Sequence, residues 1–216
     1  MILTRTPLRV SLFGGGTDYS AWFMQRPGAV LGMAINKYVY VGVKPLPPGQ
    51  LLPDGLPIRY RVQYSKVDDC RTVAEIKHPA VRAALRYLGV DIPLEFHVFG
   101  DLPGRSGLGG SSAFSVGCLH ALMTLLGIPL PGTLLDLGRE AVAFEQFAIR
   151  EAVGMQDQLF AAVGGVQYIT FSAVGSCVHP VQISPERVKQ LEESLVLVYS
   201  GGMRDSPAMA AKQIER

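Results

Sequence analysis

A glycine-rich segment, Gly100–Phe114 (GDLPGRSGLGGSSAF), has the residue types and spacing most suited to chemistry in this sequence. It lies between a segment that predicts a strand and a segment that predicts a helix. The first turn of a helix exposes unpaired N–H groups and the positive end of the helix dipole, which suits an anion. Glycines let a backbone approach a phosphate closely, and serine hydroxyls add donors or reach a metal ion. A nucleotide phosphate is therefore a physically sensible ligand of this loop.

The loop departs from the two best-known nucleotide-binding patterns. Gly104-x-x-x-x-Gly109 is followed by Gly110 and Ser111, so the Lys of the standard P-loop is missing. After Gly107-x-Gly109, a dinucleotide fingerprint would need a small third residue at position 112, which is Ser112, and no regular βαβ unit surrounds the loop. Neither motif identifies the ligand.

Two further interpretations of the loop involve no phosphate. The segment Gly109–Ala113 approaches the G-x-S-x-G nucleophile elbow but ends in Ala. That chemistry also needs a histidine, and downstream only His120 and His179 are available, the first in a predicted buried helix and the second in a predicted turn. The other interpretation is a glycine-rich turn with serine helix caps.

Two acidic residues downstream of the loop could complete a phosphoryl-transfer site. Glu145 lies within the mostly apolar segment AVAFEQFAI, and Asp157 follows Gly154 in GMQDQLFAA. Taken singly, Glu145 could be a solvent-facing acid of a helix, and Asp157 a first-turn acid that complements the helix dipole. Phosphoryl transfer requires a phosphate cradle, oxygen ligands for Mg²⁺, and a group that orients or deprotonates the acceptor. The loop and the two acids together supply these parts.

Three motifs of the sequence, in order, resemble those of the GHMP kinases, the family of galactokinase, homoserine kinase, mevalonate kinase and phosphomevalonate kinase. Thr6–Tyr19 (TPLRVSLFGGGTDY) is similar to the sugar-binding motif of galactokinases, and Leu102–Ala113 (LPGRSGLGGSSA) to the phosphate-binding loop of the family. Glu145 and Asp157 are similar to the metal-ligand Glu and catalytic Asp of the galactokinase branch. The resemblance covers essentially the whole chain. It implies an α+β fold, the GHMP-kinase N-terminal domain, which is ribosomal protein S5 domain 2-like.

The resemblance implies that ATP and Mg²⁺ bind at the glycine-rich loop. Glu145 would hold Mg²⁺ together with Ser111, or with its neighbour Ser112. Asp157 would accept the proton of the attacking sugar hydroxyl, and Arg9 would keep that carboxylate ionised. Arg9 could instead be a solvent-facing arginine of a strand edge. The nucleotide phosphates would lie along Pro103, Gly104, Arg105, Ser106, Gly107, Leu108, Gly109, Gly110, Ser111 and Ser112.

The same resemblance implies a sugar substrate and is nearest to the heptose-phosphate kinases, because of the segments FGGGTDY and INKYVYV. The implied reaction is ATP-dependent phosphorylation of a sugar hydroxyl, at the anomeric position of a heptose phosphate such as D-glycero-D-manno-heptose 7-phosphate. A galactokinase would have Glu-His where this chain has Gly15-Gly16, which leaves room for another or bulkier sugar. A galactokinase-like sugar 1-kinase and a GHMP-fold protein that binds sugar or nucleotide without turnover stay open. The residues expected at the sugar are Gly15, Gly16, Thr17, Asp18 (which could instead be a turn residue) and Tyr19.

The elements that must position these residues follow from local patterns. Alternation and β-branched residues predict strands, and a proline-rich loop predicts a long hairpin between the second strand and the third. Helices follow from apolar spacing, capping residues and glycine stops. Strands and helices are mixed without regular βαβ alternation, which favours α+β. The predicted strands are 9–13, 34–43, 59–65, 94–99, 166–171 and 195–199, and the predicted helices are 79–88, 111–126, 133 to about 150, 156–163 and 185–193.

Composition limits the remaining possibilities. Of the 216 residues, 48% are apolar and 18% charged, so a core can form, and a net charge of +2 without a basic run argues against nucleic acid as a partner. Three scattered cysteines, Cys70, Cys118 and Cys177, fit a reducing compartment, and we find neither a signal peptide nor an apolar run that predicts a membrane span. A cytoplasmic protein whose partners are ATP and a sugar or sugar phosphate is expected. The oligomeric state is not predicted.

The domain organisation follows from the resemblance as well. Residues 1–192 are expected to form the ATP- and sugar-binding N-terminal domain, and residues 193–216 to begin a C-terminal domain, with a helix starting near Pro207. The third glycine-rich motif of the family, which belongs to a C-terminal domain, is not in this sequence. We therefore expect the chain to be an N-terminal portion with the C-terminal domain largely missing.

Overall fold

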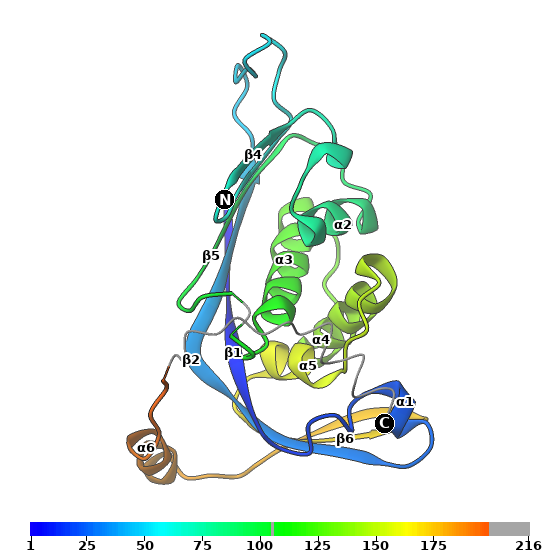
Figure 1. Ribbon diagram of the computed structural model, residues 1–216, viewed down its shortest axis with the longest axis vertical. Helices are drawn as coiled ribbons and strands as arrows, with labels where there is room; N and C mark the ends of the chain where they lie inside the picture. Colours follow the sequence, from blue (N-terminus) through cyan, green and yellow to red (C-terminus); the bar gives the residue numbers. More distant parts are fainter. Residues whose placement is uncertain (105, 199–216) are drawn as a thin grey trace.

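A mixed sheet with helices against one of its faces forms the body of the structure (Figure 1). The structure is a computed structural model and describes residues 1–104 and 106–198. Within them the strands are β1 (Ile2–Phe13), β2 (Gly28–Pro45), β3 (Tyr60–Gln63), β4 (Val67–Cys70), β5 (Leu94–Gly100), β6 (Val166–Ser172) and β7 (Gly175–Pro180). The helices are α1 (Ser20–Phe23), a 3₁₀ turn (Val73–Glu75), α2 (Pro79–Tyr87), α3 (Gly110–Leu126), α4 (Leu134–Ala143), a π-helix (Phe144–Ile149), α5 (Gln156–Val163) and α6 (Pro185–Glu193).

Strand β2, with 18 residues, connects all parts of the sheet. Strand β1 pairs antiparallel along it, from Ile2↔Val43 to Phe13↔Leu31. The first half of β2 also pairs with β6 and its second half with β5, which gives the order β4-β3-β5-β2-β6-β7 with β1 off this path. The register between β1 and β2 shifts between Pro7 and Arg9. Such irregularities redirect a side chain and are common beside active sites.

Helix α3 lies between the sheet and the other helices (Figure 1). It is apolar nearly all round because it is buried on most sides, and Leu119 and Leu122 are fully enclosed. Burying each such side chain contributes about 1.5–3 kcal/mol. Gly117 brings the helix close to β1: its carbonyl accepts a hydrogen bond from Thr4 Oγ1 at 2.9 Å, and a Cβ there would lie 2.6 Å from Thr6 Oγ1. The glycine thus fixes how closely α3 packs on the sheet.

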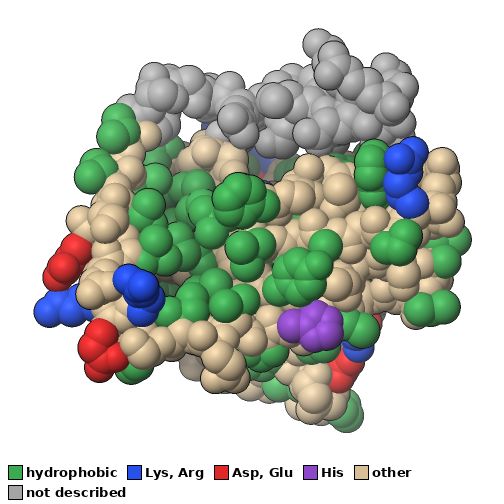
Figure 2. Space-filling model, turned by 90° about the horizontal axis from the view of Figure 1, so that it is seen from below, with side chains coloured by type: hydrophobic (Ala, Val, Ile, Leu, Met, Phe, Trp, Pro, Cys, Tyr) green, Lys and Arg blue, Asp and Glu red, His purple; other side chains and the backbone are tan. Residues whose placement is uncertain are grey.

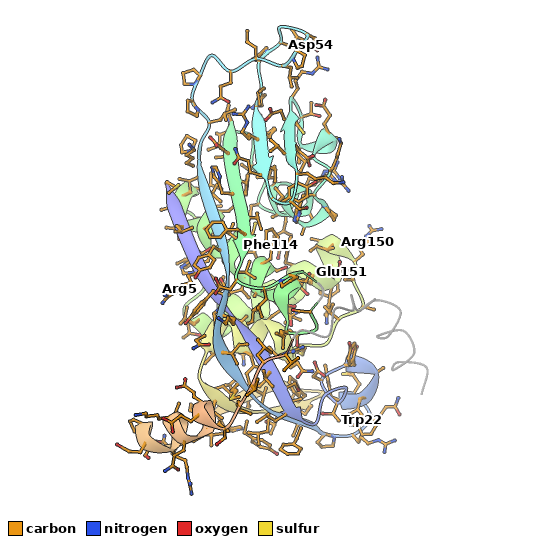
Figure 3. All side chains as sticks on the ribbon, turned by 60° about the vertical axis from the view of Figure 1, so that its left-hand side comes forward. Arg5, Trp22, Asp54, Phe114, Arg150 and Glu151 are labelled. Atoms are coloured by element: carbon orange, nitrogen blue, oxygen red, sulfur yellow. The ribbon has the colours of Figure 1, made fainter. Side chains whose placement is uncertain are left out.

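Helix α4 begins at a capping box and is followed directly by a π-helix. In the capping box, Thr133 and Asp136 bond each other's backbone. Helix α4 then continues as a π-helix, which ends at Arg150 in the left-handed region with φ 67°. Figure 3 shows Arg150 and Glu151 at this end, on the side of the molecule where the chain turns towards α5. One long helix to about residue 150 was predicted; its extent is confirmed, but its last part has the wider π geometry.

Some sequence expectations were wrong. Strand β3 does not form a hairpin with β2, because β5 lies between them and pairs with both. His179, expected in a turn, lies in β7, a strand that alternation alone did not reveal. Residues 195–198 have no regular structure, so the strand expected there is not confirmed over the described part of it. Tyr199 and the helix expected near Pro207 lie outside the described residues.

The other predicted elements are present, although β1 and β2 begin earlier than predicted and β4 and α1 were not predicted. The mixed α and β architecture without βαβ alternation is confirmed. The proline-rich segment after β2 is a loop that projects beyond the sheet, with Asp54 at its tip (Figure 3).

At the opposite end of the molecule, the face in Figure 2 carries many hydrophobic side chains. Among the described residues, no helix combines the length and apolar character needed to span a bilayer.

Candidate active site

The glycine-rich loop reaches the start of α3 through two glycines in a left-handed conformation. Gly107 has φ 78° and Gly109, the N-cap of α3, has φ 75°. Residues with a Cβ rarely adopt this conformation, which explains glycine at both positions. Gly109 also has no side chain with which to cap the helix. The first N–H groups of α3 therefore have no capping oxygen of the kind that Ser, Thr or Asp would supply. These N–H groups are thus available to bind an anion.

Strand β1 holds this loop through Arg9. The backbone N–H of Arg9 donates to the Leu108 carbonyl at 3.0 Å, and its Nη1 donates to the Gly107 carbonyl at 2.9 Å. The bonds lie directly after the register shift in β1 between Pro7 and Arg9. Arg9, which the sequence analysis pairs with Asp157, thus also joins the loop to the sheet.

Arg9 and Asp157 form a two-pronged ion pair. Arg9 Nε lies 2.8 Å from Asp157 Oδ1, and Nη2 lies 2.8 Å from Oδ2. The side chains are 13% and 27% exposed, so the pair is sheltered but reachable. A Cβ on Gly109 would lie 3.1 Å from Arg9 Cγ and 3.5 Å from Asp157 Oδ2. The N-terminus of α3 and the carboxylate of α5 therefore meet at one point, and glycine allows the approach.

Glu145 occupies a different environment, beside Ser112 in the first turn of α3. It lies in the π-helix and is fully buried. Its Oε2 accepts hydrogen bonds from Ser112 Oγ at 3.1 Å and from Gln158 Nε2 at 2.8 Å. Burial raises the pKa of Glu145 to about 7, although the hydroxyl and amide donors around it act in the opposite direction. Among the described residues, its Oε1 has no hydrogen-bond partner.

The two serines of the loop differ in position. Ser112 is buried and contacts Glu145, whereas the Ser111 side chain is exposed. The structure thus brings Ser112 and Glu145 together. His120 lies nine residues beyond Ser111 in the same helix, about 13 Å along its axis at ~1.5 Å per residue. This separation removes His120 as the base of a nucleophile elbow.

A Mg²⁺ ion fits this side of the site on chemical grounds. Buried polar atoms are normally paired, so an unpartnered carboxylate oxygen inside a protein calls for an explanation. Glu145 Oε1 is such an atom, beside a serine hydroxyl, and Mg²⁺ prefers oxygen ligands. In the described parts of the chain, no three His, Cys, Asp or Glu side chains gather as a complete metal cage. Mg²⁺ typically takes one or two protein oxygens and completes its shell with phosphate and water, which is compatible with this arrangement.

The segment expected at the sugar is folded tightly against β2 and α5. Gly14 and Gly16 have φ of 84° and 97°, and Thr17 Oγ1 donates to the Gly14 carbonyl at 2.8 Å and accepts from Ala29 N at 3.0 Å. These bonds place Thr17 in the turn that joins the segment to β2. Gly15 lies near Gln156, since a Cβ on it would be 3.7 Å from the amide nitrogen of that residue. The turn thus reaches α5.

Asp18 and Tyr19 lie beside the Arg9–Asp157 pair. Asp18 is 1% exposed, and burial raises its pKa, with the charge of Asp157 acting in the same direction. Tyr19 is half-buried, and its pKa is raised by burial and by the charges of Asp18 and Asp157. The structure therefore brings this segment to the catalytic candidates.

The remaining loop residues are less informative. Pro103, Gly104 and Ser106 lie in the bend that precedes α3, and a Cβ on Gly104 would meet no atom within 4 Å. Arg105 lies outside the described residues. Sequence reasoning missed Gln158, whose amide contacts Glu145, although it directly follows Asp157 in the chain.

Most of these site residues lie in a segment that is similar to a known protein family. Residues 74–165 match the family model described as the GHMP kinases N terminal domain. The match includes the glycine-rich loop, Glu145 and Asp157. This segment of the chain is thus similar to a GHMP kinase N-terminal domain, and the mixed α and β fold agrees with that likeness.

Among curated relatives, the chain is 28% identical over 218 residues to the D-glycero-alpha-D-manno-heptose 7-phosphate kinase of Campylobacter jejuni, with 99% of this chain and 62% of the relative covered. A solved D-glycero-D-manno-heptose 1-phosphate kinase from Bacteroides thetaiotaomicron is similar with a TM-score of 0.75 and 26% identity, over 89% of this chain and 63% of that one. The galactokinase of Lactococcus lactis, solved with galactose, shares the fold with a TM-score of 0.56 and 19% identity, over 84% and 48% of the two chains. The chain thus spans less than two thirds of the length of these relatives.

Proposed function

We propose that this protein transfers the γ-phosphoryl group of ATP to a hydroxyl of a sugar. The observation that carries the proposal is the Arg9–Asp157 ion pair, held at 2.8 Å beside Gly107 and Gly109 of the loop. A carboxylate at the mouth of a phosphate-binding loop is placed to act on the nucleophile that attacks a bound phosphate. Glu145, buried beside Ser112 at the start of α3, supports the proposal because it would supply an oxygen ligand for a metal ion.

In this proposal Asp157 accepts the proton of the attacking hydroxyl. Both of its oxygens receive a hydrogen bond from Arg9, and each keeps a free acceptor direction. The guanidinium fixes the plane of the carboxylate and supplies its counter-charge. A base positioned in this way contributes about 10²–10⁴-fold to the rate.

The loop and α3 would bind the nucleotide. The N–H groups of the first turn of α3 and the backbone from Pro103 to Ser112 would face the phosphates, as the family resemblance implies. Glu145, with Ser112 or Ser111, would hold Mg²⁺, and the buried contact between Glu145 and Ser112 favours Ser112. When bound, the ion supplies positive charge that stabilises the developing negative charge on the phosphoryl oxygens.

We infer that the acceptor is a heptose phosphate, phosphorylated at its anomeric hydroxyl, with D-glycero-D-manno-heptose 7-phosphate as the reference substrate. Support comes from the relatives in Campylobacter and Bacteroides, whose names specify heptose phosphates. Gly15 and Gly16 support a sugar larger than galactose, since a Cβ on Gly16 would meet nothing within 4 Å. The more distant likeness to galactokinase keeps a galactokinase-like sugar 1-kinase as the alternative. The presence of both acids argues against a purely sugar- or nucleotide-binding protein.

An ADP-release assay with a panel of hexoses, heptoses and their 7-phosphates tests the proposal. The assay needs the protein expressed from its full reading frame. We expect the highest kcat/KM with a heptose 7-phosphate and a product in which phosphorus couples to the anomeric proton. Preference for galactose would select the alternative, and the absence of sugar-dependent ADP release across the panel would contradict the kinase proposal.

We also propose that residues 1–192 form the N-terminal domain and that residues 193–216 begin a second one. The end of α6 at Glu193 agrees with a boundary near that position. Limited proteolysis of a longer form should cut near residue 193 and leave 1–192 folded. Preferred cleavage inside α3–α5 instead would contradict this division.

A further inference from the structure

Asp18 lies at the N-terminus of α5, 138 positions away in sequence. Its Oδ2 accepts from the backbone N–H of Gln156 at 3.1 Å, and its Oδ1 accepts from Gln156 Nε2 and from Gly16 N, each at 3.1 Å. Its backbone carbonyl also accepts from Met155 N at 3.3 Å. With 1% of the residue exposed, these bonds account for both carboxylate oxygens.

These contacts replace a helix cap that α5 lacks. The N-cap of α5 is Met155, a residue without a side-chain oxygen that could bind the first N–H groups. Asp18 supplies that oxygen from another segment and binds the N–H of Gln156, the first residue of α5. The negative carboxylate also suits the positive end of the helix dipole. A residue from the turn after β1 therefore caps the helix that carries Asp157.

Gly154 makes room for this arrangement. A Cβ on Gly154 would overlap Asp18 Oδ2 and would lie 2.6 Å from Asp18 Cγ. Gly154 is not one of the residues with positive φ, so backbone conformation does not demand a glycine here. The close approach of the Asp18 carboxylate is the reason that the structure offers for glycine at this position.

Asp157 is therefore fixed from two sides by the same N-terminal segment. Its side chain is held by Arg9 of β1, and its backbone follows Gln156, which is held by Asp18. Placement of a catalytic group matters because a misplacement of about 1 Å can reduce a rate by about 10²-fold.

We propose that Asp18 is a positioning residue: it caps α5 from the turn after β1, and thereby holds Asp157 at the glycine-rich loop. Gly154 is the complementary residue that permits this cap. The proposal rests on the proposed function and gives Asp18 a role different from the sugar contact that the sequence suggests. It also explains why the motifs TDY and GMQD occur together: Asp18 of the first motif contacts Gly154 and Gln156 of the second.

The test compares Asp18→Asn with Gly154→Ala in the protein expressed from its full reading frame. Asp18→Asn replaces one acceptor oxygen by an NH2 group that faces a backbone N–H, and Gly154→Ala adds a Cβ that overlaps the carboxylate, so both variants disturb the cap. Unlike Asp18, Gly154 has no side chain that could bind a sugar hydroxyl. We expect each to lower kcat by about 10- to 100-fold with a nearly unchanged KM for the sugar. Amide hydrogen exchange of Gln156 and Asp157 should accelerate by about fivefold, a factor typical of a lost helix cap.

A double variant sharpens the test. In Asp18→Gly with Gly154→Ala, the methyl group enters space vacated by the carboxylate, so the loss should be no larger than that of Asp18→Gly alone. Gln156→Ala removes only the side-chain amide contact and serves as a milder variant if Asp18→Asn does not fold. It should accelerate exchange of the first turn of α5 in the same direction.

Asp136→Ala is the matched control. Asp136 belongs to the capping box of α4, so its loss should lower stability without a change in kcat. The proposal is overturned if Asp18→Asn raises the sugar KM while kcat and the exchange of α5 stay as in the unchanged protein. Hydrogen exchange needs no turnover, so it tests the cap even if no sugar is phosphorylated, an outcome that would contradict only the proposed function.

Discussion

The two acids of the site, Asp157 and Glu145, are both near the start of α3 but are stabilised in different ways. Asp157 is 27% exposed, and Arg9 balances its charge through two hydrogen bonds. Glu145 is fully buried, and the polar side chains around it, those of Ser112, Ser115 and Gln158, are neutral. A buried carboxylate without a cation is costly to ionise, which agrees with a pKa raised to about 7.

The difference indicates separate tasks for the two acids. The chain itself supplies the counter-charge of Asp157, so this carboxylate is available as a base without any bound ion. Glu145 obtains a counter-charge only from something that binds next to it, and its unpartnered Oε1 is the atom available for that contact. The account therefore predicts that substitutions of the two acids change different properties.

The largest effect is expected for Asp157→Asn. The amide cannot accept a proton, so kcat should fall by about 10²–10⁴-fold. The affinity for ATP, measured by titration calorimetry, should stay within about twofold, because the proposal assigns Asp157 to the acceptor hydroxyl and not to the nucleotide. A variant that keeps its full rate would show that Asp157 is not the base.

Arg9→Lys is expected to have a smaller effect. Lysine keeps the charge but cannot make two parallel hydrogen bonds to a carboxylate, so Asp157 loses its fixed plane. We expect kcat to fall about 10-fold, within the range that positioning effects cover. Arg61→Lys is the control, because Arg61 forms a similar two-pronged pair with Asp69 on β3 and β4 and should leave kcat unchanged. Equal losses in both variants would contradict a special role for Arg9.

Glu145→Gln should stabilise the protein when Mg²⁺ is removed by a chelator. The raised pKa means that ionised Glu145 destabilises the fold, with no cost below about pH 4.5, an increasing cost up to about pH 7, and the full cost above it. At pH 8 the variant should gain up to roughly 3 kcal/mol in unfolding free energy, since one pKa unit corresponds to about 1.4 kcal/mol. Urea unfolding at pH 4.5 and pH 8 measures the difference. A gain of equal size at both values would contradict burial of the charge as its cause.

The smallest effect is expected for Gly109→Ala. The left-handed φ and the approach of Arg9 Cγ to 3.1 Å oppose a side chain, so we expect a loss of about 1 kcal/mol in unfolding free energy. Gly104→Ala is the stability control, because its Cβ would meet open space and its φ is not positive. If both variants have the same unfolding free energy, the close approach of Arg9 to Gly109 does not require a glycine at that position.

The parts of the fold that depend on neighbouring residues could be predicted from the sequence. The capping box at Thr133 and the buried helix after the glycine-rich loop follow from local hydrogen bonding and apolar spacing. The insertion of β5 between β2 and β3 could not be predicted, because it depends on pairing between distant segments. Strand β7 was missed for a related reason: it is a short edge strand whose partner, β6, provides its order.

The candidate site shows the same limit. Arg9, Glu145 and Asp157 could be nominated because their motifs resemble those of a family, and the structure places Arg9 against Asp157. Their catalytic and metal-binding roles stay predictions. Neither the Asp18 cap of α5 nor the Gln158 contact with Glu145 could be predicted from the sequence. Each joins residues of different elements, and only the folded structure shows that these elements lie close together. The choice of Ser112 over Ser111 likewise depends on which face of α3 is buried.

The most direct test of the difference between the two acids is the unfolding midpoint measured with ATP plus a chelator and with ATP plus Mg²⁺, in the absence of sugar. Ligands that bind the folded state raise this midpoint according to their affinity. Mg²⁺ should raise it further than ATP alone in the unchanged protein and in Asp157→Asn, but not in Glu145→Gln. An equal Mg²⁺-dependent increase in Glu145→Gln would contradict the account, because the buried carboxylate would then not be the group that meets the ion.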